Sequence, residues 1–130
     1  MCKAMYSEQV LDHFHHPRNV GEIEPPAIVV ETVNPACGDL MKLWVRVRDG
    51  VIVDAKFKVA GCVPAVACGS WLTERIKGAP LAELTILASE RIADALGGLP
   101  AASRHAAVLA SDALRQLLAR LHQRQTGIGP

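Results

Sequence analysis

The stretch MKLWVRVRDGVIVDAKFKV, residues 41–59, decides the fold. Apolar and polar side chains alternate along both of its halves, which is the pattern of strands with one buried face. Between the halves, Asp49-Gly50 is a dipeptide that favours a two-residue hairpin turn. The stretch therefore predicts two antiparallel strands. The apolar face of the second strand is predicted to hold Val51, Val53, Ala55, Phe57 and Val59.

A third strand is predicted just upstream of this hairpin. Residues 27–33 are rich in β-branched side chains, which fit a pleated sheet. The connection Asn-Pro-Ala-Cys-Gly-Asp, residues 34–39, suits a tight turn, because Pro35 fixes its own φ and Gly38 can adopt left-handed angles. The three segments predict an antiparallel meander in which this turn lies near the exit of the last strand.

Helices are predicted before and after the sheet. Ser7 is a suitable N-cap for a short first helix, which Pro17 ends. Pro64 suits the first turn of a second helix, residues 81–95 predict one or two short helices, and a long C-terminal helix follows Pro100. The predicted fold class is α+β, a three-stranded antiparallel sheet with helices packed on one face.

The size and charge of the chain restrict its function. Its 130 residues predict a single domain, residues 1–130. With 14 basic and 13 acidic residues the net charge is +1, which argues against nucleic acid or a membrane surface as partner. No apolar run approaches the roughly 18 residues of a membrane span. The first residues also lack the apolar core of a signal peptide, so a cytoplasmic location is expected.

The chain has four cysteines, which in a cytoplasmic protein are expected to be free thiols, metal ligands or nucleophiles. None of them forms a CxxC pair. Cys37 lies two residues before Asp39 on the turn between strands. Cys62 lies between the last strand and a helix, where exposed amides and the helix dipole would favour a thiolate. Cys68 is predicted to be a core residue, because it is in helical phase with Ala65, Leu72 and Ile76.

The histidines are a weaker signal. His13, His15 and His16 lie near the end of the first predicted helix. They are interpreted as a solvated helix end, since no cysteine or carboxylate cluster accompanies them. His105 lies in the first turns of the C-terminal helix, and a lone histidine there is usually structural or solvated.

Several short motifs follow one another along nearly the whole chain. They are HPRNVG at 16–21, ACGD at 36–39, Gly61-Cys62, Leu99-Pro100 and His105. In this order they resemble the U-type iron–sulfur cluster assembly scaffolds, the family of IscU and the NifU N-terminal domain. The order of the motifs is far more specific than any one of them.

The resemblance implies a common site for Cys37, Asp39, Cys62 and His105, in one partly exposed pocket at the end of the sheet. There they would bind iron or a 2Fe–2S cluster, with no catalytic residue. The resemblance also implies a cysteine desulfurase as sulfur donor and apo-proteins as cluster acceptors. A cluster with an incomplete ligand set could be bridged between the subunits of a homodimer.

The chain departs from the family pattern at two points. Where the family has a third cysteine directly after the histidine, this chain has Ala106. The family's Leu-Pro-Pro-Val-Lys segment, read by an Hsp70-type chaperone, is LPAAS at residues 99–103, so that chaperone is not an expected partner. Cys2 and Cys68 are extra cysteines without a counterpart at the site.

Two other readings of the same residues remain open. Two sulfurs, one nitrogen and one oxygen would also make a closed tetrahedral zinc site, as in a sulfur acceptor of the Suf type. A thiol nucleophile with His105 as base and Asp39 as its orienting partner would make the chain an enzyme. The enzyme reading is disfavoured, because nothing else in the chain suggests a substrate pocket.

Overall fold

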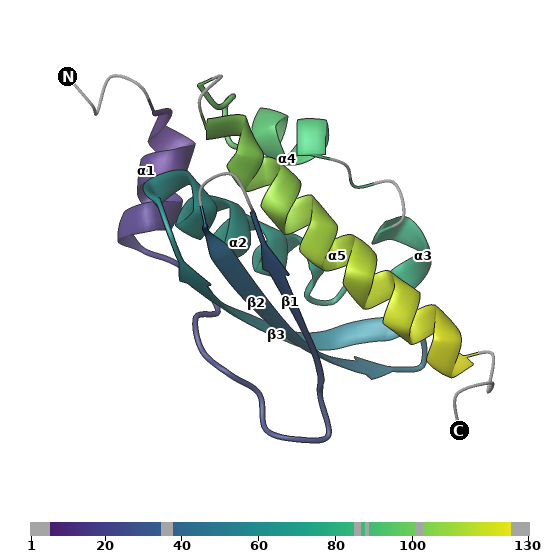
Figure 1. Ribbon diagram of the computed structural model, residues 1–130. Coiled ribbons are helices and arrows are strands. Elements are labelled where there is room, and N and C mark those ends of the chain that lie inside the picture. Colours follow the sequence, from purple (N-terminus) through teal and green to yellow (C-terminus); the bar gives the residue numbers. More distant parts are fainter. Residues whose placement is uncertain (1–5, 35–37, 85–86, 88, 101–102, 126–130) are drawn as a thin grey trace.

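The computed structural model describes residues 6–34, 38–84, 87, 89–100 and 103–125 (Figure 1). Within those ranges no helix is long and apolar enough to cross a lipid bilayer. Along the chain the elements are α1 (Glu8–His15), β1 (Ile28–Val33), β2 (Leu40–Arg48), β3 (Val51–Ala60), α2 (Val63–Ile76), α3 (Leu81–Leu84), α4 (Ser89–Ala95) and α5 (Arg104–Gln125).

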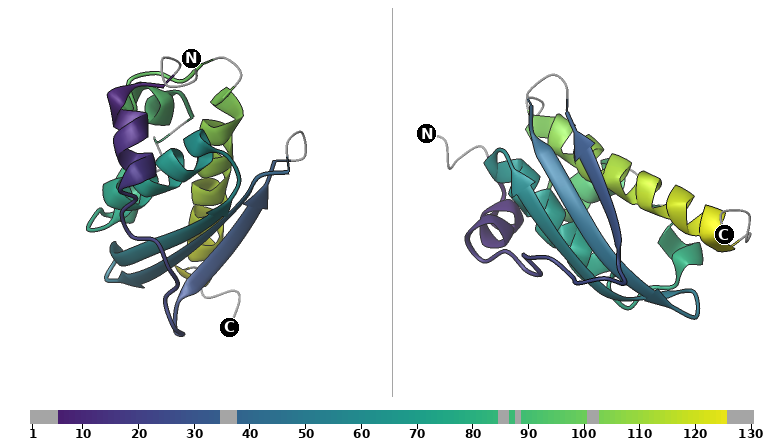
Figure 2. Two further views of the ribbon diagram at one scale, coloured as in Figure 1. Left: turned by 90° about the vertical axis from the view of Figure 1, so that its left-hand side faces the viewer. Right: turned by 60° about the horizontal axis from the view of Figure 1, so that its bottom comes forward.

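The three strands form one antiparallel sheet in the order β1-β2-β3, which confirms the predicted meander. Asp49 and Gly50 turn the hairpin with φ angles of 55° and 77°, as a two-residue hairpin turn requires. The helices α2 and α5 cover one face of the sheet, and α1 packs against α2 (Figures 1 and 2). The predicted α+β class is therefore confirmed.

The predicted apolar face of the second strand is wrong at its start: Val53 is exposed, and Val51 lies outside the core cluster. A β-bulge interrupts the register, since Arg46 pairs with Asp54 whereas Val47 pairs with Ile52. The extra residue on β3 reverses the alternation of its side chains. Ile52 is therefore fully buried, and Val53 is 41% exposed.

The outer face of the sheet is covered in part by residues 19–26, which run along β3 and across β2. The backbone of Phe57 pairs with Asn19 and Gly21, and the Arg46 guanidinium donates to the carbonyl oxygen of Glu24 at 2.9 Å. Trp44 is consequently buried, although it lies outside the core cluster between sheet and helices. The free edge of β3 is thereby paired at Phe57.

The main core lies between the sheet and the helices α2 and α5. Cys68 is fully buried there, as predicted. Gly69 allows the closest approach of α2 to the sheet, because a Cβ atom at this position would lie 2.5 Å from a carbon of the Phe57 ring. That distance is far inside van der Waals contact, so only glycine lets α2 lie this close to β3.

The N-terminal helix begins as predicted, with Ser7 as its N-cap. The Ser7 hydroxyl accepts a hydrogen bond from the Val10 amide at 3.1 Å. The same hydroxyl donates to the carbonyl oxygen of Leu96, at the end of α4. One side chain therefore caps α1 and joins it to the segment that leads towards α5.

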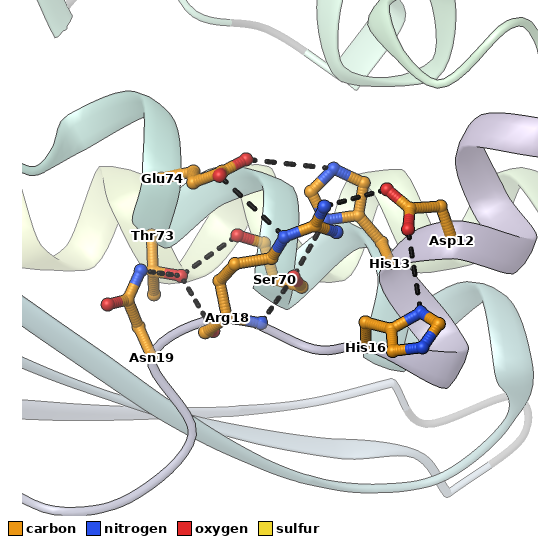
Figure 3. Close-up of polar contacts among 8 residues, drawn as sticks. All are labelled: Asp12, His13, His16, Arg18, Asn19, Ser70, Thr73 and Glu74. Atoms are coloured by element: carbon orange, nitrogen blue, oxygen red, sulfur yellow. Dashed lines mark hydrogen bonds and ion pairs between the residues drawn. The ribbon is translucent and has the colours of Figure 1, made fainter.

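A polar cluster joins α1 to α2 (Figure 3). His13 Nδ1 lies 2.7 Å from Ser70 Oγ, which also accepts the Arg18 amide at 2.9 Å. The Arg18 guanidinium pairs with Asp12 at 2.7 Å and with Glu74 at 3.7 Å. The residues of the HPRNVG motif in this cluster therefore hold α1 against the sheet-covering helix.

The interpretation of the three histidines as a solvated helix end is wrong for His13. It is only 7% exposed, because it lies three residues after Val10 on the face of α1 that packs against α2. His15 and His16 are exposed, as expected. Burial lowers the pKa of His13, and the charge of Arg18 lowers it further.

The buried histidine makes stability depend on pH. Because the pKa of His13 is lower in the folded protein, protonation favours the unfolded chain, whose histidine titrates near about 6.5. Its stabilising contribution is complete above that pH and is lost as pH falls towards the folded-state pKa. We expect the free energy of unfolding, measured by urea denaturation between about pH 5 and 8, to fall over this window.

The matched variants are His13→Gln and His16→Gln, since His16 lies exposed near the same helix end. His13→Gln should remove this part of the pH dependence, whereas His16→Gln should keep it. Equal pH slopes for the wild type and His13→Gln would contradict the assignment.

The contact of Gly69 with Phe57 is tested by Gly69→Ala. Alanine raises helix propensity by about 1 kcal/mol, but the added methyl group collides with the Phe57 ring, and such overpacking costs about 1–3 kcal/mol. We expect a net loss in the free energy of unfolding. Adding Phe57→Leu should remove part of the loss, and a stabilised Gly69→Ala protein would show that the helix can shift freely.

Candidate metal centre

Three potential metal ligands come together from three parts of the chain. Asp39 directly precedes β2, Cys62 is the N-cap residue of α2, and His105 lies in the first turn of α5. The register of the sheet sets two of them side by side, because Leu40 pairs with Ala60. Asp39 directly precedes Leu40, and Cys62 follows Ala60 by two residues, so both ligands lie at the same end of the sheet.

The Asp39 carboxylate lies between the other two groups. Its Oδ2 atom accepts a hydrogen bond from the Cys62 thiol at 3.0 Å and lies 3.8 Å from Nε2 of His105. One ligand atom from each residue lies within 4.8 Å of the other two. Asp39 is 8% exposed, Cys62 is half-buried, and the His105 side chain is 31% exposed. The group is thus accessible from one side.

Glycine at position 61 makes room for this carboxylate. A Cβ atom at Gly61 would lie 2.6 Å from Cγ of Asp39, so any larger residue would displace the carboxylate. The turn that carries Asp39 is itself closed by backbone bonds, from the amide of Asn34 to the Asp39 carbonyl and from the amide of Gly38 to the Asn34 carbonyl. The sequence offered Gly61 only as part of a Gly-Cys motif, and its role depends on the register of the sheet.

Of the four predicted site residues, the structure brings together Asp39, Cys62 and His105. Cys37 lies outside the described residues, so its place at the site stays a prediction. Cys2 also lies outside them. Cys68 is fully buried in the core, and Ala106, next to His105, is fully buried and offers no ligand atom.

The expectation that the helix end favours a Cys62 thiolate is wrong for the protein without metal. Burial raises the pKa of Cys62 to about 11, and the hydrogen bond to Asp39 and its charge raise it as well. The backbone amide of Ala65 lowers this pKa, but burial and the hydrogen bond to Asp39 each have a larger effect. A metal ion would reverse the balance, because a coordinated thiol loses its proton.

Comparisons with known proteins agree with these observations. The NifU-like N terminal domain family matches residues 5–127. The chain is 46% identical over 114 residues to the iron-sulfur cluster assembly scaffold protein IscU 1 of Archaeoglobus fulgidus, covering 88% of this chain and 74% of that protein. It is 42% identical over 124 residues to the scaffold protein IscU of Haemophilus influenzae, covering 92% and 98% respectively.

Solved structures share the fold at lower identity. The N-terminal NifU-like protein from Brucella abortus matches with a TM-score of 0.76 at 21% identity, covering 94% of this chain and 97% of that chain. A putative SUF-system scaffold protein from Fervidobacterium islandicum matches with a TM-score of 0.73 at 23% identity, covering 91% and 99%. At these identities the likeness supports the fold alone.

The raised pKa of Cys62 predicts slow alkylation. A rise from 9.0 to about 11 lowers the thiolate fraction about a hundredfold. The thiolate of a weaker acid is the stronger nucleophile, and this raises the reaction rate again by about tenfold. With iodoacetamide at about pH 8 and site-resolved mass spectrometry, we expect Cys62 to react about tenfold more slowly than N-acetylcysteine.

The substitution Asp39→Asn should speed this reaction, because it removes the carboxylate that raises the pKa of Cys62. Asp112→Asn on α5 is the control and should leave the rate unchanged. A Cys62 that reacts like free cysteine in the wild type would contradict the buried, protonated thiol.

Proposed function

The chain belongs to the NifU-like N-terminal domain family, and from this premise we propose that it is an iron–sulfur cluster assembly scaffold. Its cargo is iron or a 2Fe–2S cluster, which it holds during assembly and then gives to apo-proteins. The observation that supports this most is the convergence of Asp39, Cys62 and His105 within 4.8 Å at an accessible end of the sheet.

We propose Cys37 as the fourth ligand of this site. In the sequence it stands two residues before Asp39, in the segment that connects β1 to β2. Thiolates are the ligands that iron–sulfur clusters prefer, so Cys37 and Cys62 would hold the iron most strongly. Ala106 stands where the family has its third cysteine, which limits this site to two thiolates with one carboxylate and one imidazole.

This mixed ligand set suits a cargo that has to leave. In the protein without metal, the Cys62 proton is held by Asp39, so binding of iron has to displace that proton. Protons and iron therefore compete for the same sulfur. A site of four thiolates would hold a cluster more firmly and release it less readily.

The proposed role needs partners rather than a catalytic residue. A cysteine desulfurase would supply the sulfur, and apo-proteins would receive the cluster. The partial exposure of Cys62 and His105 leaves the site within reach of both. We also propose a cytoplasmic location, because the free thiols Cys62 and Cys68 suit a reducing compartment.

Zinc is a second candidate for the same site. A thiol, an imidazole and a carboxylate are already gathered there, and with one further thiolate they match the four ligands of a tetrahedral zinc ion. In that case the chain would be a zinc-binding sulfur acceptor. The metal retained by the isolated protein distinguishes the two functions.

The scaffold function is tested by anaerobic reconstitution with ferrous iron and sulfide, followed by visible absorption and metal analysis. We expect the wild type to form a 2Fe–2S cluster and Cys62→Ser to lose most of it. Cys68→Ala is the matched control, because Cys68 lies in the same helix but in the core. It should keep its cluster and lose about 1 kcal/mol of stability.

Other outcomes have clear meanings. Failure of the wild type to form a cluster, together with one zinc ion per chain as isolated, would favour the zinc function. Unchanged metal content in both Cys37→Ser and Cys62→Ser would contradict the site itself.

A further inference from the structure

The two edges of the sheet differ, because the edge of β3 is paired at two places and no strand of the described chain lies along the edge of β1. On β3, residues 19–21 pair with Phe57, and Pro80 forms a bridge with Val51. No strand of the described chain pairs with the outer side of β1. The open edge therefore lies on the side of β1 away from β2 (Figure 2).

The register shows which groups of β1 point outwards. The amide of Asn34 bonds to Asp39, so the backbone of Asn34 faces the chain of β2. Backbone direction alternates along an antiparallel strand, so the N–H and C=O groups of Val33, Glu31 and Val29 face away from β2. The contact of Arg120 with the Val29 carbonyl oxygen confirms this, because Arg120 reaches it from α5.

The open part of the edge is short and bounded. Arg120 occupies the Val29 carbonyl at one end, at 2.6 Å, and the turn after Val33 closes the other. Between them, the backbone groups of Glu31 and Val33 have no partner among the described residues. They are spaced as another extended chain requires, with one residue between them.

A groove runs beside this open edge. It has a volume of about 470 Å³ and is lined by β1 and α5. The Val33 side chain is 53% exposed, and Glu31 is exposed with no ion pair in the described chain. Asp112 is paired with Arg115 at 3.3 Å, so Glu31 is the uncompensated charge of the groove. The residues that line the groove are Glu31, Thr32, Val33, Asp112, Arg115, Gln116 and Ala119.

We propose that this edge binds an extended segment of a protein partner, which adds as a fourth strand beside β1. Its backbone bonds to Glu31 and Val33, an apolar side chain covers Val33, and a lysine or arginine faces Glu31. Backbone pairing supplies the affinity in this mode of recognition, and the side-chain positions supply the specificity.

A second copy of this chain fits the edge less well. The open residues 31–33 span only about 10 Å of strand. A stable interface between two folded proteins buries about 1,200 Å² or more, which so short an edge does not provide by itself. A short extended segment needs no more than the open length. Since Val33 pairs with Leu40, next to Asp39, a bound segment would end beside the metal centre; a role in cluster transfer rests on the proposed function.

The test uses the full chain and the peptide Lys-Thr-Val-Thr-Lys, blocked at both ends, in an NMR titration. Its valine and its two lysines lie on the same face of an extended chain, as the side chains of Val33 and Glu31 do on β1. We expect shifts and slower hydrogen exchange at the amides of Glu31 and Val33. Val33→Pro removes one outward-facing N–H and leaves the β1–β2 pairing intact, so it should weaken binding about tenfold. Val33→Thr keeps that N–H and should bind within about twofold of the wild type.

Two further controls test the chemistry of recognition. The same peptide with methylated backbone nitrogens should not bind, because it cannot donate to the edge. Glu31→Lys should weaken binding of this peptide and strengthen binding of Glu-Thr-Val-Thr-Glu.

Three results would overturn the proposal. They are absence of binding to the wild type, equal binding to Val33→Pro, and shifts confined to residues away from β1. A wild-type dimer that Val33→Pro converts to a monomer in sedimentation would assign the edge to a second copy instead. Cluster loading, measured in parallel, should be equal in the wild type and Val33→Pro. Its absence from both would count against the proposed function without affecting the strand.

Discussion

The pairing of β2 with β3 is the constraint on which the rest of the structure depends. It places Leu40 opposite Ala60, and so it sets Asp39 beside the Gly61-Cys62 corner where α2 begins. A slip of one residue would turn every buried side chain of a strand to the other face and would separate the carboxylate from the thiol. The same register therefore maintains both the core and the candidate metal centre.

This pairing brings the Asp39 carboxylate beside the Cys62 thiol, and the two groups would repel each other if both were ionised. A half-buried thiol beside a carboxylate keeps its proton, since a second negative charge there would be poorly solvated. A cation relieves that conflict by supplying the missing positive charge. The proposed metal ion would therefore stabilise the ionised form of the site, and the partly exposed His105 would complete its ligand set.

Local patterns in the sequence predicted the parts of the fold that local chemistry determines. The Asp49-Gly50 turn, the Ser7 cap and the buried phase of Cys68 all follow from neighbouring residues. The bulge that exposes Val53 does not, because Val51, Ile52 and Val53 are all apolar and the local pattern does not show which of them faces the core. His13 is buried against Ser70, 57 positions away, a contact that no helical pattern reveals.

The site shows the same division between local and distant causes. The residue patterns alone drew attention to Cys37, Asp39 and Cys62, whereas His105 joined them through family resemblance, and Cys37 remains a prediction. The thiolate expected at Cys62 failed because its burial and its Asp39 partner come from the tertiary fold.

Arg120 on α5 has a consequence for the behaviour of the protein at high concentration. Open strand edges are the places at which folded proteins begin to aggregate, by adding strand to strand without end. By occupying the Val29 carbonyl, Arg120 interrupts the open edge of β1 after three residues. One side chain on a distant helix thus shortens the length of edge along which strands of other molecules could add.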